Sequence, residues 1–231
     1  MSIHYEINAS VGHLILDRPE KANAYDRAHL RALSDAMSSI EEHCAVVIIR
    51  SAHPSVFCAG ADLNEMKEAT PEDARELYSQ HLFTRISRSP MVSIAVVDGI
   101  AVGGGCELAL CADLRVVGSA AVFRLPETSL GIIPAAGGCT RLTRLLGTSI
   151  AKQVILAGKD ISAKEAVRWG LAKDGATDAL ATASVLAEHI ATRNPDALAQ
   201  AKQIIDGAAE DQSLAAEREA QALLYSKRST E

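Results

Sequence analysis

A chain of 231 residues is long enough for one large domain, and its 48% of hydrophobic residues suffice for a sizeable core. Aromatic residues make up only 3%, so that core is expected to consist of Ala, Val, Ile and Leu. A net charge of −6, with the basic residues dispersed along the chain, argues against a nucleic-acid partner and against an anionic membrane surface.

The cysteines and histidines predict neither disulfide bonds nor a metal site. Five cysteines cannot all pair, no C-x-x-C pattern occurs, and no two of the seven histidines have the spacing of metal ligands. Small buried thiols are typical of a reducing compartment. No signal peptide and no run of eighteen apolar residues is evident, so we expect a cytoplasmic protein that does not enter a membrane.

The first half of the chain predicts alternating strands and helices. Strands are expected at residues 11–16, 45–50, 91–97, 113–117 and 121–123, where the chain is apolar over short runs. Helices are expected at 26–40, 71–87 and 106–111, with a turn at 99–105. Asp26 and Thr70 are suitable N-caps for the first two helices.

From about residue 135 the pattern is almost wholly helical. Helices are expected at 148–156, 162–169, 176–192, 195–208 and 211–227. The recurring order of strand, loop and helix in the first half is typical of a stacked β–β–α coil or of a parallel α/β domain. We therefore predict an α/β core over residues 1–175, followed without a linker by a helical region over residues 176–231.

Two glycine-bearing segments are candidates for binding a ligand through the backbone. Gly103, Gly104 and Gly105 precede a short apolar helix, so unpaired N–H groups point at whatever lies there. A developing oxyanion suits such groups, and the tight loop at residues 59–62 offers a second donor. No lysine follows the glycines and no G-x-G-x-x-G follows the first strand, which argues against a phosphate loop and a dinucleotide fold. Taken alone, such a run is more often a packing or turn device.

Glu107 and Glu127 are the candidate acid–base pair. Glu107 lies inside an apolar helix, where an unpaired charge is unfavourable, so its carboxyl group must be hydrogen-bonded or functional. Glu127 follows Pro126 in a loop and would by itself be read as an ordinary loop acid. Because both lie beside glycine-rich backbone, together they favour general acid–base catalysis next to an activated carbonyl. No motif of an activated nucleophile, such as G-x-S-x-G, is present.

Five segments, taken in order, resemble the crotonase (enoyl-CoA hydratase/isomerase) superfamily over about residues 11–171. They are Leu16–Ala24, similar to its NRP…NA segment; Phe57–Leu63, similar to F.AGAD; Gly103–Leu108, similar to GGGCEL; Phe123–Leu142, similar to F..PE…G..P..GG..RL; and Gly158–Ala166 with Gly170 and Leu171, similar to G..I.A.EA…GL.

The resemblance implies a spiral of ββα turns, a C-terminal helical region used in trimerisation, and an acyl-CoA thioester as ligand. CoA is then part of the substrate, and no separate cofactor or metal is expected. By position, the N–H groups of Ala61 and Gly104 would form an oxyanion hole, and Glu107 and Glu127 would be the catalytic carboxylates. Further contacts to the substrate or to CoA are expected from Arg18, Lys21, Ala22, Ala24, Ala59, Gly60, Asp62, Leu63, Gly105, Pro126 and Ala135.

Because both glutamates are kept, the resemblance favours an enoyl-CoA hydratase, a lyase that adds water across the 2,3 double bond of a 2-enoyl thioester. A delta-isomerase, or a specialised hydratase acting on a CoA- or carrier-bound thioester, is the enzymatic alternative. A catalytically idle binding scaffold, including an RNA-binding relative, is the alternative from another class. The acidic net charge and both glutamates count against that scaffold. The expected assembly is a homotrimer or a dimer of trimers.

Three features depart from the family pattern. Ala135 replaces the glycine usual in a PG.GG turn, and Arg124 stands where many hydratases have glycine, which would place an arginine near the mouth of the acyl pocket. The sequence stops at Glu231, where relatives usually continue into a last helix that covers the CoA. A short pantetheine on a carrier protein is therefore a second ligand to consider.

Overall fold

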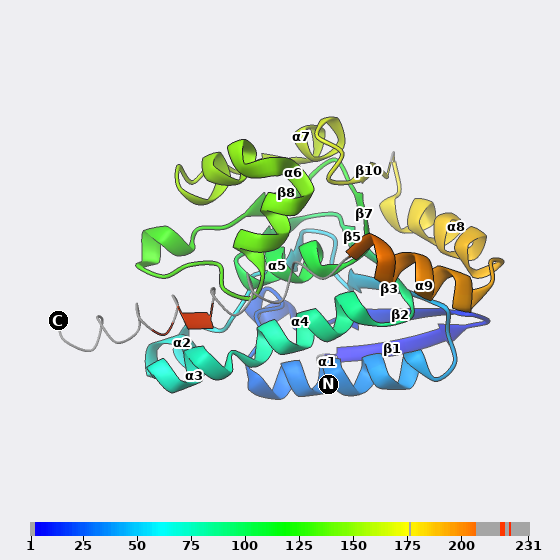
Figure 1. Cartoon of the computed structure of the whole chain (residues 1–231), viewed down its shortest axis with the longest axis horizontal. Coiled ribbons are helices and arrows are strands. Elements are labelled where there is room, and N and C mark those ends of the chain that lie inside the picture. The colour runs from blue at the N-terminus through cyan, green and yellow to red at the C-terminus, as the bar shows by residue number, and fades with distance from the viewer. Residues whose placement is uncertain (1–2, 176, 207–217, 220–221, 223–231) are drawn as a thin grey trace.

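The chain alternates between two sheets, and this alternation generates a spiral of β–β–α turns (Figure 1). The computed structural model describes residues 3–175, 177–206, 218–219 and 222. A six-stranded sheet has the order β1 (Ile3–Asn8), β2 (Val11–Leu16), β3 (Val46–Ser51), β5 (Val92–Val97), β7 (Leu114–Val117) and β10 (Lys173–Asp174). A four-stranded sheet has the order β4 (Val56–Cys58), β6 (Ile100–Val102), β8 (Val122–Arg124) and β9 (Ile161–Ser162). Successive strands from β3 to β8 thus belong to the two sheets in turn.

The central strands of the larger sheet are parallel and covered on both faces, which explains why their sequences are apolar without alternation. In β3, Val47 and Ile49 pack in the larger core cluster with helix α1 (Arg27–Glu41), while Val46 and Ile48 pack against α8 (Ala179–Ala191). Successive side chains of a strand point to opposite faces, so one strand serves both layers. The helical region after residue 175 is therefore not separate from the core, because its helix α8 packs against one face of the larger sheet.

The remaining helices lie around the two sheets (Figure 1). They are α2 (Leu63–Glu68), α3 (Pro71–Glu76), α4 (Tyr78–Arg88), α5 (Gly104–Cys111), α6 (Gly138–Ile155), α7 (Ala163–Arg168) and α9 (Pro195–Asp206). Helix α4 lies beside α1, and α9 lies beside α8 (Figure 1). Short 3-10 helices lie at Pro19–Lys21 and Glu127–Leu130. α5 is buried along its length from Gly105 to Cys111, so it runs through the core rather than over it.

Most of the expected elements are confirmed, and their N-caps explain where they begin. Asp26 accepts hydrogen bonds from the N–H groups of Ala28 and His29, and Thr70 forms a reciprocal capping box with Asp73. The strands expected at 11–16, 45–50, 91–97, 113–117 and 121–123 all form, within one residue at each end.

Four expectations are corrected by the structure. The helix expected at 71–87 is two helices, broken at Leu77, whose φ of 21° and ψ of 71° are not helical. The turn expected at 99–105 contains strand β6, and α5 begins at Gly104 rather than at residue 106. The helix expected at 148–156 is only the second part of α6, which bends at Gly147. The helix expected at 176–192 begins at Ala179, with Asp178 as its N-cap.

The C-terminal expectations are tested only in part. Helix α9 forms from Pro195, but residues 207–208 of that prediction and nearly all of the helix predicted at 211–227 lie outside the described residues. None of the helices in the described part of the chain is long and apolar enough to cross a bilayer.

Candidate active site

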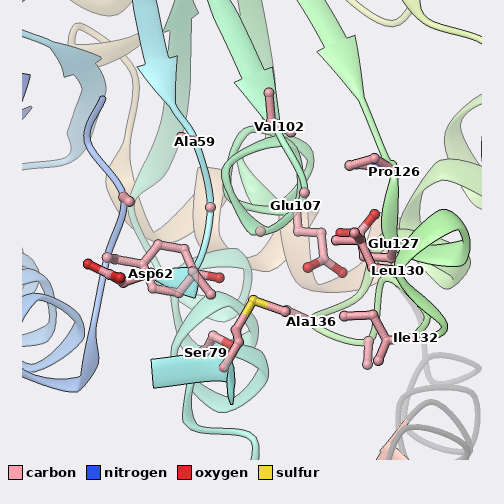
Figure 2. Close-up of a pocket in the computed structure, with 18 of the residues that line it drawn as sticks. Ala59, Asp62, Ser79, Val102, Glu107, Pro126, Glu127, Leu130, Ile132 and Ala136 are labelled. Atoms are coloured by element: carbon pink, nitrogen blue, oxygen red, sulfur yellow. The ribbon is translucent and has the colours of Figure 1, made fainter. Parts of the chain in front are cut away.

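A cavity of about 560 Å³ opens where the start of α5, the loop after β4 and the 3-10 helix after β8 converge (Figure 2). Most of the residues singled out in the sequence line it: Lys21, Ala24, Ala59, Gly60, Ala61, Asp62, Gly104, Glu107, Pro126, Glu127 and Ala135. These residues come from four segments far apart in the chain, and the spiral of the fold brings them to one place.

Glu107 lies in the first turn of α5 and is buried, with 4% of its surface exposed. Its Oε1 accepts a hydrogen bond of 2.8 Å from the N–H of Gly138, the first residue of α6. A methyl group on Gly138 would lie 3.0 Å from that oxygen, so the glycine permits the close approach. The carboxyl group is thus held by the starts of two helices, where the helix dipoles favour negative charge.

Glu127 is the first residue of the 3-10 helix at Glu127–Leu130 and is also buried, with 7% exposed. Figure 2 shows the side chains of Glu107 and Glu127 pointing toward one another inside the cavity. The Oε2 atom of Glu127 has no hydrogen-bond partner among the described residues. Burial raises the pKa of this carboxyl group from 4.5 to about 7, because the charged form loses its hydration.

The N–H groups of Ala61 and Gly104 have no acceptor in the described part of the chain. Tyr25 pairs with the loop on either side of Ala61: the N–H of Tyr25 donates to Gly60 O, and the N–H of Asp62 donates to Tyr25 O, both at 2.8 Å. The N–H of Ala61, which lies between these two hydrogen bonds, therefore points away from Tyr25. A methyl group on Gly60 would lie 3.0 Å from the nitrogen of Gly104, which brings the two donor segments together.

Lys21 and Asp62 are charged residues of the cavity lining, and Arg18 lies beside them. Lys21 Nζ lies 3.6 Å from Asp62 Oδ2, and Arg18 Nη2 lies 3.7 Å from the same oxygen. The pKa of Asp62 is lowered, first by the hydrogen bond from the N–H of Asn64 and then by the charges of Lys21 and Arg18. Lys21 lines the cavity and is half-exposed, whereas Arg18 does not line it.

Of the residues expected to contact the substrate or CoA, Arg18, Ala22 and Gly105 stand outside the cavity lining, and the side chain of Leu63 lies outside the described part of the structure. Arg18 donates to Ala24 O at 2.8 Å and so braces the loop, and the carbonyl of Ala22 accepts a 3.0 Å hydrogen bond from the N–H of Ala59. Gly105 packs against β4, because a methyl group there would lie 2.0 Å from Cys58 O. Leu63 begins α2.

The side chain of Arg124, which was expected near the mouth of the pocket, is paired with Asp160 and does not enter the cavity lining. Its guanidinium group binds the carboxylate of Asp160 through two hydrogen bonds, with Nε 2.8 Å from Oδ1 and Nη2 2.5 Å from Oδ2. Arg124 is absent from the cavity lining. The arginine instead ties β8 to the loop that enters β9, which is its neighbour in the smaller sheet.

Several other residues that line the cavity were not expected individually as site residues. They are Tyr25, Asn64, Met66, Leu77, Ser79, Val102, Leu130, Ile132, Ile133 and Ala136. Most are apolar, which is typical of a site for a hydrocarbon chain. In the described part of the chain, no group of three or more His, Cys, Asp and Glu side chains is placed to hold a metal ion.

Comparison with known proteins decides the family. The sequence profile of the enoyl-CoA hydratase/isomerase family matches residues 6–231. The chain belongs to this family. It is 40% identical over 218 residues to the probable enoyl-CoA hydratase 2, mitochondrial, of Arabidopsis thaliana, a match that covers 92% of this chain and 72% of that protein. It is 36% identical over 224 residues to the short-chain-enoyl-CoA hydratase of Clostridium acetobutylicum, covering 93% and 86%.

A solved structure of the enoyl-CoA hydratase/isomerase family agrees with this fold. The enoyl-CoA hydratase from Bacillus anthracis aligns with a TM-score of 0.85 and 34% identity, over 99% of this chain and 92% of that one. The crotonase resemblance and the α/β spiral expected from the sequence are therefore confirmed.

Proposed function

We propose that this member of the family is an enoyl-CoA hydratase, a lyase that adds water across the 2,3 double bond of a 2-enoyl thioester. The observation that carries the proposal is the convergence of two buried carboxyl groups, Glu107 and Glu127, with two unpaired backbone N–H groups in one cavity. Hydratases named among its relatives, including the 2,3-dehydroadipyl-CoA hydratase of Escherichia coli at 39% identity over 199 residues, support it.

The N–H groups of Ala61 and Gly104 bind the thioester oxygen in this mechanism. Their hydrogen bonds strengthen as negative charge moves onto that oxygen, so they stabilise the enolate formed when water attacks the β-carbon. Loss of one such donor typically costs about 3 kcal/mol of transition-state stabilisation. Gly104 begins α5, and the positive end of the helix dipole acts in the same direction.

The two glutamates divide the proton transfers. Glu107 accepts a proton from the attacking water as the new C–O bond forms at the β-carbon, and the π electrons move toward the thioester. Glu127 then delivers a proton to the α-carbon. A carboxyl group with a pKa of about 7 is half protonated at neutral pH, which suits the donor role. One water molecule is consumed, and the site is reset when Glu107 releases its proton to solvent and Glu127 takes up one proton from solvent.

CoA itself is part of the substrate in this proposal, and Lys21, which lines the cavity, and Arg18, which lies beside Asp62, are the candidate cations for its phosphates. A homotrimer or a dimer of trimers, a cytoplasmic location, and the choice between CoA and a carrier-bound pantetheine stay predictions. Sedimentation of the purified chain and turnover of crotonyl-pantetheine beside crotonyl-CoA test the assembly and the carrier.

The proposal is tested by loss of the conjugated-thioester absorbance when crotonyl-CoA is mixed with the protein. Wild type is expected to hydrate it, and Glu107→Gln and Glu127→Gln are each expected to lose several orders of magnitude in kcat. Glu188→Gln, on the exposed face of α8, is the matched control and should keep full activity. Isomerisation of 3-enoyl-CoA by wild type, with full activity retained in either glutamine variant at Glu107 or Glu127, would replace the hydratase by a one-glutamate isomerase.

A further inference from the structure

Two hydroxyl groups in the cavity have no task in the hydration mechanism. They belong to Tyr25 and Ser79, which both line the cavity and are 9% and 7% exposed. Figure 2 shows Ser79 across the cavity from Glu127. Polar groups buried to this extent in a ligand cavity usually fix the orientation of the ligand.

Tyr25 is held rigidly against the oxyanion donors. Its backbone pairs with the loop at Gly60–Asp62, and its ring meets Phe83 edge-on, with centroids 6.0 Å apart and an interplanar angle of 89°. A methyl group on Gly104 would lie 1.9 Å from the Tyr25 hydroxyl oxygen. The hydroxyl therefore touches the residue whose N–H is proposed to bind the thioester oxygen.

The hydroxyl groups of Tyr25 and Ser79 have hydrogen-bonding positions that no described residue fills. Apart from their interaction with each other, neither is hydrogen-bonded to any residue that the structure describes. A hydroxyl group offers one donor and two acceptor positions, so the pair retains at least one proton to donate. A buried donor without a partner costs free energy, and a ligand oxygen would remove that cost.

The charged groups near Tyr25 and Ser79 favour a ligand oxygen that carries no charge. Burial first, and then the negative charge of Glu107, raise the pKa of the Tyr25 phenol well above its usual value, so the phenol remains a proton donor. Glu127 acts on it in the same direction. A ligand carboxylate would meet the same two glutamates and be repelled, whereas a carbonyl or hydroxyl oxygen would not.

We propose that Tyr25 and Ser79 form a polar subsite for an uncharged oxygen substituent on the acyl chain. Because the Tyr25 hydroxyl touches Gly104, that substituent lies within a few carbons of the thioester rather than at the far end of the chain. The rest of the wall, which includes Val102, Leu130 and Ile132, is apolar and suits hydrocarbon. This inference rests on the proposed function only in taking an acyl thioester as the ligand of the cavity.

The test is equilibrium binding of two saturated ligands, pentanoyl-CoA and 4-oxopentanoyl-CoA, by calorimetry. Both lack the 2,3 double bond, so neither can be hydrated. Wild type is expected to bind the oxo ligand about 3- to 10-fold more tightly, the range for one neutral hydrogen bond. Tyr25→Phe should reduce this preference, and Tyr25→Phe combined with Ser79→Ala should abolish it, with pentanoyl-CoA bound within about twofold of wild type.

Tyr78→Phe is the matched control, because Tyr78 lines only the adjoining cavity, whereas Tyr25 and Ser79 line both cavities. It should keep the preference for the oxo ligand. Equal binding of the two ligands by wild type, a preference that survives the double substitution, or a parallel loss of affinity for both ligands would overturn the subsite. Failure to hydrate crotonyl-CoA with the binding preference intact would refute only the hydratase, and failure to bind either saturated ligand while crotonyl-CoA is hydrated would refute only the subsite.

Discussion

The raised pKa of Glu127 predicts that this residue lowers the stability of the fold at neutral and alkaline pH. Its carboxyl group titrates at about 7 in the folded protein, against 4.5 for an unperturbed glutamate. Between these values the folded state binds more protons than the unfolded state, so the free energy of unfolding falls as the pH rises through this window. Glu127→Gln removes the titration and is expected to remove this pH dependence.

The expected magnitude follows from the pKa shift. One pH unit within the window corresponds to about 1.36 kcal/mol, so wild type should lose about 2 kcal/mol relative to Glu127→Gln between pH 5.5 and pH 8.5. Most of this change falls below the folded-state pKa of about 7. The difference in the free energy of unfolding between the two proteins at one pH removes the contribution of all other titrating groups. The change of this difference with pH then removes the constant effect of the new amide.

Urea unfolding at a series of pH values, at one fixed protein concentration, measures this difference. Glu188→Gln is the control, because its carboxyl group is exposed on α8 and its substitution should leave the pH dependence of wild type unchanged. A difference between wild type and Glu127→Gln that stays constant within about 0.5 kcal/mol from pH 5.5 to pH 8.5 would show that the pKa of Glu127 is not raised in the folded protein.

The other predictions concern the same site and its support. The kcat/KM for crotonyl-CoA should fall about tenfold per pH unit above a pH of about 7, because Glu127 must be protonated to deliver its proton; activity that still rises at pH 8.5 contradicts this. Gly104→Ala would put a methyl group 1.9 Å from the Tyr25 hydroxyl and displace an oxyanion donor, so kcat/KM should fall about 100-fold with an unchanged circular-dichroism spectrum; a loss below threefold contradicts it. Lys202→Met removes the 2.8 Å ion pair with Asp113 that ties α9 to the sheet, and should cost about 2 kcal/mol in denaturant unfolding; no change in midpoint would show that the pair contributes nothing.

The sequence predicted the elements whose signal is local. Strand β3 is a continuous apolar run because both of its faces are covered. Asp26 and Thr70 are residue types that favour the N-cap position, and each directly precedes a helix. Glu107 and Glu127 could be paired because each stands beside glycine-bearing backbone, and they do meet in one cavity.

The features that the sequence did not predict depend on contacts between distant residues. The break at Leu77 has no glycine or proline to mark it, since a leucine adopts the positive φ. Arg124 was expected near the pocket mouth from its position in the family pattern, and its pairing with Asp160 could not be seen because the two residues are 36 positions apart in the chain. Tyr25 carries no motif, and its place in the site follows from strand pairing with the loop beside Ala61.

In the proposed mechanism the two carboxyl groups act together in one hydration event, Glu107 on the water and Glu127 on the α-carbon, and a double-mutant cycle in kcat for crotonyl-CoA measures this coupling. Wild type, Glu107→Gln, Glu127→Gln and the double variant are compared under the same conditions. If the two groups work as a unit, each single substitution costs several orders of magnitude and the double variant is within about tenfold of the slower single variant. Independent, multiplying losses, or wild-type activity in either single variant, would contradict the account.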